Sequence, residues 1–299
     1  METTPEKAIL SVVSLLPRRI GEAIGRACEG LAAEEIRLRV SKPPQIVTDT
    51  SDLILDNVVF TRDDAKEFLE RLCRRSVYSH AEELKRGFVA VEGGVRVGVC
   101  GRPVTEDGRI VRLTDASCFN VRITREVIGC AENLIASVSE NGRPVSSLIA
   151  APPGGGKTTL LRDLIRCFSN GAGVKPCKVA VADERGELAG CVGGAPSFSI
   201  GRRTDVMELA PKSESIALMI RTMSPDLIVT DEIGGREDAL ALAEAARCGA
   251  AIIASVHAST GDELLSRGSL APILEAGVFK RALLIRRNGS RLHVSPIKL

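Results

Sequence analysis

The stretch Ala151-Pro-Pro-Gly-Gly-Gly-Lys-Thr158 is the feature that most narrows what this chain of 299 residues can fold into. It follows an apolar run, Ser146–Ala150, and precedes a helix-like run, Thr159–Cys167. A glycine-rich turn between a strand and a helix lets backbone N–H groups approach a phosphate chain without interference from side chains. The order of strand, glycine turn and helix therefore predicts a phosphate-binding loop in an α/β fold.

The residues of this loop have separate expected roles in binding ATP. Lys157 supplies a mobile positive charge for the β- and γ-phosphates, and the Thr158 hydroxyl is placed to ligate Mg²⁺. The contacts to the nucleotide are assigned to Pro153, Gly154, Gly155, Gly156, Lys157, Thr158 and Thr159. Such loops usually open with glycine, and Ala151 at that position would cost about 1 kcal/mol or more if the backbone there needed a positive φ.

A pair of adjacent carboxylates follows another apolar run, Leu227–Thr230. Asp231, at the end of this expected strand, can hold magnesium through its water shell. Glu232 can accept a proton from the attacking water, so it is the expected catalytic base. The pair favours a hydrolase over a protein that only binds ATP.

Two further polar groups follow expected strands. Asp183-Glu184-Arg185 comes after Cys177–Ala182, and His257 comes after Ile252–Val256. Because the carboxyl ends of parallel strands meet at one edge of a sheet, these side chains are expected near the phosphate-binding loop. His257 is expected to sense the γ-phosphate or orient water rather than bind a metal, since the sequence has no second histidine near it.

The second half of the chain predicts a mostly parallel sheet. From about residue 145, short apolar runs alternate with helical stretches, a pattern that is typical of an α/β domain. The expected strands are Val145–Ala151, Lys178–Asp183, Leu227–Asp231, Ala251–Val256 and Ala282–Ile285. The domain boundary is expected around a helix-like segment, Glu126–Ser139, and is set at residues 1–130 and 131–299.

The first half predicts a smaller α+β domain. Apolar residues alternate between residues 84 and 123, and the turn signals Gly93-Gly94 and Asp107-Gly108 divide this stretch into an antiparallel meander. A helix over Asp63–Arg75 is expected behind a capping Thr61. Near the N-terminus, Ala8–Leu16 predicts an amphipathic helix, whose apolar face either packs in the core or docks to a membrane surface or partner.

Composition excludes several classes of protein. Forty basic and 38 acidic residues nearly cancel, and the chain has no Trp and one Tyr, so nucleic-acid binding is not expected. The nine cysteines form no closely spaced pairs, which favours reduced thiols over zinc ligands or disulfides. No apolar run is long enough for a transmembrane segment, and acidic residues before Ala8 argue against a signal peptide.

Arginines near the motifs are candidates for the residue that completes an ATP site between domains or subunits. They are Arg202, Arg203, Arg221 and Arg236 around the core motifs, and Arg86, Arg96, Arg102 and Arg122 in the meander. The sequence does not single out one of them.

Four of these motifs together resemble those of a known family. In chain order, Ala151–Thr158, Asp183–Arg185, Met223–Gly234 and Ala254–Ala258 resemble the Walker A motif, Asp box, Walker B motif and His box of type II/IV secretion ATPases. The stretches Glu34–Val40 and Tyr78–Phe88 extend a closer resemblance to a family of sporulation proteins related to these ATPases.

The resemblance implies a RecA-like P-loop NTPase core preceded by a smaller α+β domain. It also implies a cytoplasmic, Mg²⁺-dependent ATPase at the membrane of the mother cell of a spore-forming bacterium. There it would work as a homohexamer at the base of a channel complex, recruited by membrane-embedded subunits, with Met1–Arg26 as the candidate contact. By the same matching, Glu184 is carried over as a catalytic acid of the Asp box and His257 as the His-box residue.

Two other functions remain open at this point. A RecA-like nucleic-acid motor would use the same core, although the low net charge and few aromatic residues argue against it. A scaffold that binds ATP without hydrolysing it is the other, and the presence of Glu232 beside Asp231 argues against it.

Overall fold

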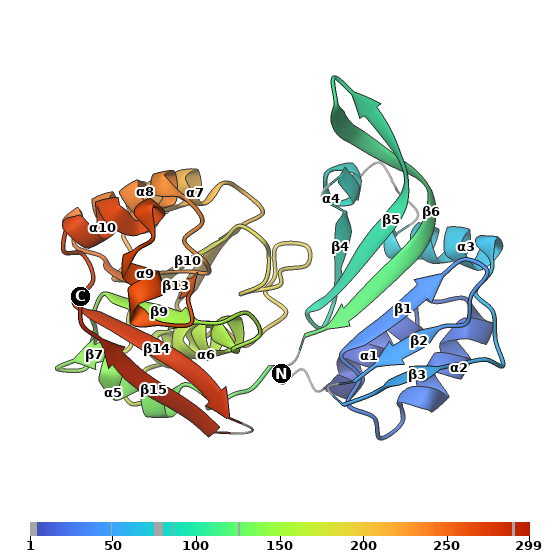
Figure 1. Ribbon diagram of the computed structural model, residues 1–299, viewed down its shortest axis with the longest axis horizontal. Helices are drawn as coiled ribbons and strands as arrows, with labels where there is room; N and C mark the ends of the chain where they lie inside the picture. The colour runs from blue at the N-terminus through green and yellow to red at the C-terminus, as the bar shows by residue number, and fades with distance from the viewer. Residues whose placement is uncertain (1–4, 49, 75–79, 86, 125, 289–290) are drawn as a thin grey trace. The chain divides into compact units, whose positions relative to one another are not determined.

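The structure is a computed structural model that describes residues 5–48, 50–74, 80–85, 87–124, 126–288 and 291–299. The chain divides into two units (Figure 1). The first comprises Met1–Glu126 with Gly190–Ser197, and the second comprises Val127–Ala189 with Phe198–Leu299. Among the described residues, no helix is both long enough and apolar enough to cross a membrane.

The first unit is an antiparallel sheet whose one face is covered by helices (Figure 1). The helices are α1 (Pro5–Val13), α2 (Arg18–Cys28), α3 (Arg62–Leu72) and α4 (Ala81–Lys85). The strands are β1 (Glu35–Arg39), β2 (Gln45–Val47), β3 (Asp52–Ile54), β4 (Phe88–Val91), β5 (Val95–Glu106) and β6 (Arg109–Ile123). Within the described part of this unit they pair in the order β3-β2-β1-β6-β5-β4. The α+β class expected for this half of the chain is confirmed.

The predicted meander is β4, β5 and β6. Gly93 and Gly94 form the first turn at φ 85° and 73°, and Asp107 and Gly108 form the second at φ 49° and 72°. In the two-residue turn Asp107-Gly108, positive φ at both residues matches the right-handed twist of the flanking strands, and in the longer first connection glycine supplies the two positive φ angles that follow Glu92. Strands β1, β2 and β3 were not predicted, and two of these have only three residues.

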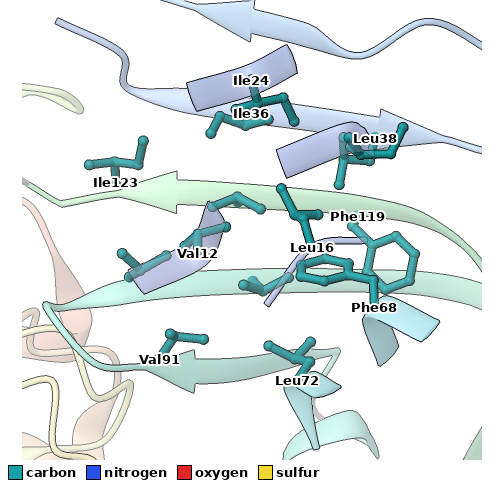
Figure 2. Close-up of a cluster of buried hydrophobic side chains, with 14 of the residues drawn as sticks. Val12, Leu16, Ile24, Ile36, Leu38, Phe68, Leu72, Val91, Phe119 and Ile123 are labelled. Carbon is teal, nitrogen blue, oxygen red and sulfur yellow. The ribbon is translucent and has the colours of Figure 1, made fainter. Parts of the chain in front are cut away.

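The N-terminal helices form part of the core of the first unit (Figure 2). Val12 and Leu16 are buried together with Ile24 of α2, against Phe68 and Phe119. This favours the core-packing interpretation of the N-terminal amphipathic stretch. The apolar face of this stretch is largely covered by the core, and contact of Met1–Arg26 with a membrane-embedded subunit stays a prediction.

The second unit contains a larger, mostly parallel sheet. Its strands are β9 (Ser147–Ala151), β10 (Val179–Asp183), β11 (Thr204–Glu208), β12 (Leu227–Thr230), β13 (Ala251–His257), β14 (Arg281–Asn288) and β15 (Arg291–Ile297). In the residues described for this unit, they pair in the order β11-β10-β12-β13-β9-β14-β15. Only β15 runs antiparallel to its neighbour. The five predicted strands are all present, and β11 and β15 were not predicted.

Helices lie on both sides of this sheet, with α6 on one side and α7, α8 and α10 on the other (Figure 1). The helices are α5 (Ile135–Val138), α6 (Lys157–Asn170), α7 (Lys212–Met223), α8 (Arg236–Arg247), α9 (Gly261–Leu265) and α10 (Ala271–Glu275), with short 3₁₀ turns at Glu132–Leu134 and Gly268–Leu270. The predicted helix-like segment Glu126–Ser139 is wrong in length. Helical structure in it is limited to the 3₁₀ turn at Glu132–Leu134 and to α5, and a two-stranded ribbon of β7 (Ser139–Glu140) and β8 (Arg143–Pro144) follows it.

The strand order places the predicted motifs at one edge of the sheet. Strand β13 lies between β9, which leads into the glycine-rich loop, and β12, which leads into the acidic pair. The residues that follow these parallel strands therefore come out side by side, at the edge where α/β proteins bind their ligands. His257, at the end of β13, is thus between Ala151 and Asp231.

Candidate functional site

The glycine-rich loop is shaped for close approach of a ligand to its backbone. Gly154 and Gly156 have φ of 71° and 80°, which is the left-handed region that favours glycine. A Cβ on Gly155 would lie 2.9 Å from the Pro152 carbonyl oxygen and 3.0 Å from Ala151 Cβ. Gly156 is also the N-cap of α6, and without a side chain it cannot cap the first N–H groups of that helix. These N–H groups are therefore available to a phosphate.

Ala151 does not strain the loop. It lies in strand β9, is fully buried and does not have a positive φ. The cost expected for an alanine in place of the usual glycine therefore does not arise. Its carbonyl oxygen accepts hydrogen bonds from the Ala258 N–H at 3.2 Å and from Lys157 Nζ at 3.2 Å.

Lys157 is the first residue of α6, and its side chain is buried. Besides Ala151, its ammonium contacts the Pro152 carbonyl oxygen at 3.5 Å and His257 Nδ1 at 2.8 Å. Burial lowers the pKa of this lysine, and the nearby Asp231 carboxylate opposes that effect. A cation that has lost its water and points at the loop is suited to binding phosphate oxygens.

Thr158 and Asp231 are in direct contact at the end of the sheet. Thr158 Oγ1 donates a hydrogen bond of 2.8 Å to Asp231 Oδ2. The other carboxylate oxygen, Asp231 Oδ1, accepts from Ser255 Oγ at 2.6 Å. The hydroxyl and carboxylate oxygens are hard ligands of the kind that Mg²⁺ prefers, and Ser255 fixes the orientation of the carboxylate.

Glu232 has an unusual backbone conformation, with φ of 38°. Non-glycine residues in this region are uncommon and occur often at functional sites. Its carboxylate lies 3.3 Å from Arg185 Nη1 and 3.9 Å from His257 Nε2. This carboxylate is 30% exposed, so water can reach it.

His257 lies between Lys157 of the glycine-rich loop and Glu232 of the acidic pair. Its Nδ1 accepts from the Lys157 ammonium, so the hydrogen-bond network assigns the ring proton to Nε2, on the side of Glu232. The expected position of His257 at the shared edge is correct. The expectation that it contacts a γ-phosphate remains a prediction.

Asp183 builds the loop after β10 rather than facing a ligand. Its buried carboxylate accepts from the N–H groups of Glu187 at 2.8 Å, Leu188 at 3.0 Å and Ala189 at 2.9 Å. Burial raises the pKa of Asp183, and these three hydrogen bonds oppose the rise. The neighbouring Glu184 is the residue of this motif whose carboxylate is left free of such backbone bonds and lines a pocket.

That pocket has a volume of about 90 Å³ and lies beside the acidic pair. Its charged lining includes Glu184, Arg185, Lys212, Asp231 and Glu232. Both carboxylates and cations line it, so it can order a water molecule next to the Glu232 carboxylate.

The residues present fit a magnesium-bound nucleoside triphosphate. The Gly155 position has no room for a Cβ, the N-terminus of α6 is uncapped, and a buried cation points at the same loop. Thr158 and Asp231 lie within hydrogen-bond distance of each other, as two ligands of one magnesium ion would. Pro153 is exposed on the turn and Thr159 is half-buried in the first turn of α6.

Several of the candidate arginines have contacts of their own, and others are exposed. Arg203 donates to the Ser169 carbonyl oxygen and Arg221 to that of Ala217. Arg202 and Arg236 are exposed. In the first unit, Arg96 stacks on Phe88, Arg122 pairs with Glu35 and Arg102 is exposed. Arg86 and Tyr78 lie outside the described residues.

Sequence reasoning missed three residues that support the site. Ser255 was read only as part of a buried strand, although its spacing from His257 puts both on one face of β13. Buried Arg162 donates to the carbonyl oxygens of Glu187 and Leu188 and so ties α6 to the loop after β10. Lys212 contacts the Glu232 carbonyl oxygen, and no sequence pattern marks it.

Solved structures share this fold. The Legionella pneumophila ATPase DotB superposes with a TM-score of 0.61 at 16% identity, covering 94% of this chain and 80% of that one. The pilus retraction motor PilT, solved with bound ADP, gives 0.62 at 14% identity, covering 91% and 80%. These likenesses confirm the predicted RecA-like P-loop core with a smaller α+β domain before it.

Sequence comparison is more specific. The chain is 39% identical over 279 residues to "Stage III sporulation protein AA" of Bacillus subtilis (strain 168), and the match covers 92% of this chain and 90% of the relative. The family described as "Sporulation stage III, protein AA" matches residues 4–298. The predicted resemblance to sporulation proteins related to secretion ATPases is confirmed, and the chain belongs to the stage III sporulation protein AA family.

Proposed function

We propose that this chain is a Mg²⁺-dependent ATP hydrolase. The observation that carries the proposal is the 2.8 Å hydrogen bond between Thr158 Oγ1 and Asp231 Oδ2, directly beside Glu232. It joins the end of the phosphate-binding loop to the acidic pair, so that a metal ligand set and a candidate base share one edge of the sheet. A protein that only held ATP would need the first of these and not the second.

Each side chain has a distinct task in this proposal. Lys157 exchanges its contacts with the Ala151 and Pro152 carbonyl oxygens for phosphate oxygens, as a mobile ammonium can. Thr158 and Asp231 hold magnesium, which supplies charge neutralisation for the triphosphate.

The water-activating part of the site lies on the other side of Asp231. Glu232 accepts the proton of the attacking water at its carboxylate. His257, whose Nε2 lies 3.9 Å from a carboxylate oxygen of Glu232, helps to fix the direction in which Glu232 points. Glu184 is proposed as a second acid that orders water in the same pocket.

The cellular role is proposed from family membership. As a member of the stage III sporulation protein AA family, the chain would energise assembly of, or transport through, a channel complex between mother cell and forespore. It would do so as a homohexamer on the cytoplasmic side of the mother-cell membrane, in contact with membrane-embedded subunits.

Phosphate release from Mg·ATP, measured against protein concentration, tests the enzymatic proposal. We expect turnover that rises more steeply than linearly, because a neighbouring subunit completes the site. Asp231→Asn should remove most of this activity, whereas Asp205→Asn, which alters an exposed carboxylate of β11, should not. Phosphate release that stays at background in the wild-type chain, or equal rates in both variants, would contradict the proposal.

A further inference from the structure

Lys212 is a buried cation whose presence the helix that carries it does not explain. It is the first residue of α7, and its side chain is 5% exposed. A positive charge at a helix N-terminus is opposed by the helix dipole, and burying an ammonium costs free energy unless it is paired. The lysine therefore has to be accounted for by what it contacts.

The Lys212 ammonium lies where three segments of the second unit meet. It donates a short hydrogen bond to the carbonyl oxygen of Glu232, in the turn after β12. It also lies 3.8 Å from Glu184 Oε2, in the loop after β10, and 3.8 Å from Asp238 Oδ2, in the first turn of α8. The ammonium therefore donates one hydrogen bond, to Glu232, and forms longer ion pairs with the two carboxylates.

Four polar backbone groups of the turn that Lys212 contacts have hydrogen-bond partners. The Glu232 N–H donates to Asp231 Oδ1 at 3.0 Å and to Ser255 Oγ at 3.1 Å. The N–H groups of the next two residues donate to the Ser255 carbonyl oxygen at 2.9 Å and to Asp238 Oδ2 at 3.0 Å. Lys212 supplies the donor for the Glu232 carbonyl oxygen.

These hydrogen bonds matter because the Glu232 backbone is strained. Its φ of 38° costs about 1–3 kcal/mol and persists only where the surroundings fix it. The same backbone conformation directs the carboxylate towards Arg185 and His257 rather than elsewhere. Loss of one partner would let the backbone relax and move the carboxylate.

We propose that Lys212 is a positioning residue for Glu232. It holds the carbonyl oxygen of Glu232 and so fixes the left-handed backbone that aims the carboxylate into the pocket. It also places one positive charge between the carboxylates of Glu184 and Asp238, which lets them lie close to this turn. Lys212 acts through Glu232, and its effect on turnover rests on the hydrolase function proposed above.

The kinetic test compares Lys212→Met with Lys212→Arg and with Lys178→Met, which alters an exposed lysine of the same unit. Lys212→Met should lower kcat at least about tenfold, because a misplaced catalytic group is costly even at 1 Å. The Kd for Mg·ATP, measured by calorimetry, should stay within about twofold of wild type. Lys212→Arg, which keeps a donor, should recover part of kcat, and Lys178→Met should match wild type. An affinity for Mg·ATP that falls by the same factor as kcat, or an unchanged kcat, would overturn the proposal.

Amide hydrogen exchange of the same variants gives a second readout that does not need turnover. In Lys212→Met, the amides of Glu232, Ile233 and Gly234 should exchange faster. Those of Leu188 and Ala189, which Asp183 holds independently, should keep their protection. Unchanged exchange in the turn, or faster exchange throughout the sheet, would overturn the positioning role even if the wild-type chain proved unable to hydrolyse ATP.

Discussion

Thr158 and Asp231 are separated by 73 positions in the sequence and joined by a hydrogen bond of 2.8 Å. One follows the phosphate-binding loop and the other follows the strand that carries the acidic pair. Their contact requires the chain to place β13 between β9 and β12. The proposed chemistry of the molecule depends on this juxtaposition.

Replacing Lys157 should abolish turnover and leave the fold intact. Lys157→Met removes the cation proposed to bind the phosphates, so phosphate release should fall at least about 100-fold. Circular dichroism should be unchanged, because the lysine contacts only two carbonyl oxygens and His257. Undiminished hydrolysis by this variant would contradict the assignment of the loop.

The same variant gives a prediction for pH dependence. Burial lowers the pKa of Lys157 in the folded chain below the ordinary 10.5, so the unfolded chain holds its proton more tightly. The contribution of Lys157 to the free energy of unfolding is therefore fully present above about pH 10.5. It is lost as the pH falls from there through the folded pKa. The free energy of unfolding of wild type relative to Lys157→Met should rise with pH in urea titrations up to that value. A constant or falling difference would show that the lysine is not desolvated.

A methyl group at Gly155 should weaken the binding of Mg·ATP. Gly155→Ala would bring a Cβ to 2.9 Å from the Pro152 carbonyl oxygen, so the loop has to shift. Calorimetry should detect a loss of affinity for Mg·ATP of at least about tenfold, given the sensitivity of such sites to position. Gly268→Ala, where a Cβ meets no atom within 4 Å, is the matched control and should bind normally. Equal affinities for the two variants would mean that the loop does not closely surround the phosphates.

Arg162 should be important for stability as well as for the site. Its guanidinium bonds the carbonyl oxygens of Glu187 and Leu188 and stacks on Phe198 at 3.7 Å. Arg162→Ala would remove two donors and the contact with Phe198, which should cost about 2–4 kcal/mol of unfolding free energy. Chemical denaturation measures this cost, and a change below about 0.5 kcal/mol would show that the contacts contribute little.

Thiol reactivity tests the burial of the cysteines. Cys100 and Cys248 are exposed and should react quickly with Ellman's reagent near pH 8. Burial raises the pKa of Cys28, Cys73, Cys167 and Cys177 to about 11 and that of Cys130 to about 12. Buried Cys28, Cys73 and Cys167 should react only when the chain unfolds, and half-buried Cys130 and Cys177 should react more slowly than the exposed pair. Fast reaction of the Cys167 thiol in the native chain would contradict the packing around α6.

The sequence predicted those features that depend on local pattern. Apolar runs predicted β9, β10 and β12 because a strand buried on both faces has few polar residues. Thr61 correctly predicted the start of α3, where its side chain accepts from the Asp64 N–H in a capping box. Strand β11 was missed, since Thr204–Glu208 has only two apolar residues, which are adjacent, and lies partly exposed at an edge of the sheet.

The support around the site could not be read from the sequence. Lys212 contacts Glu232 only because α7 packs beside the turn after β12, and such a meeting depends on the whole fold. Arg162 is one polar residue on a helix that contains several, and only its burial distinguishes it. The motif assigned the acid role to Glu184, but no pattern showed that the neighbouring Asp183 holds the loop after β10 or that Glu184 pairs with Lys212.

The most direct test of the central claim compares wild type with Glu232→Gln for binding and for hydrolysis of Mg·ATP. The substitution keeps the size of the side chain and removes its ability to take a proton. We predict that the two proteins bind Mg·ATP with affinities within about twofold of each other. Phosphate release by Glu232→Gln should fall at least about 100-fold. Equal rates of phosphate release, or no binding by the wild-type chain, would contradict this claim.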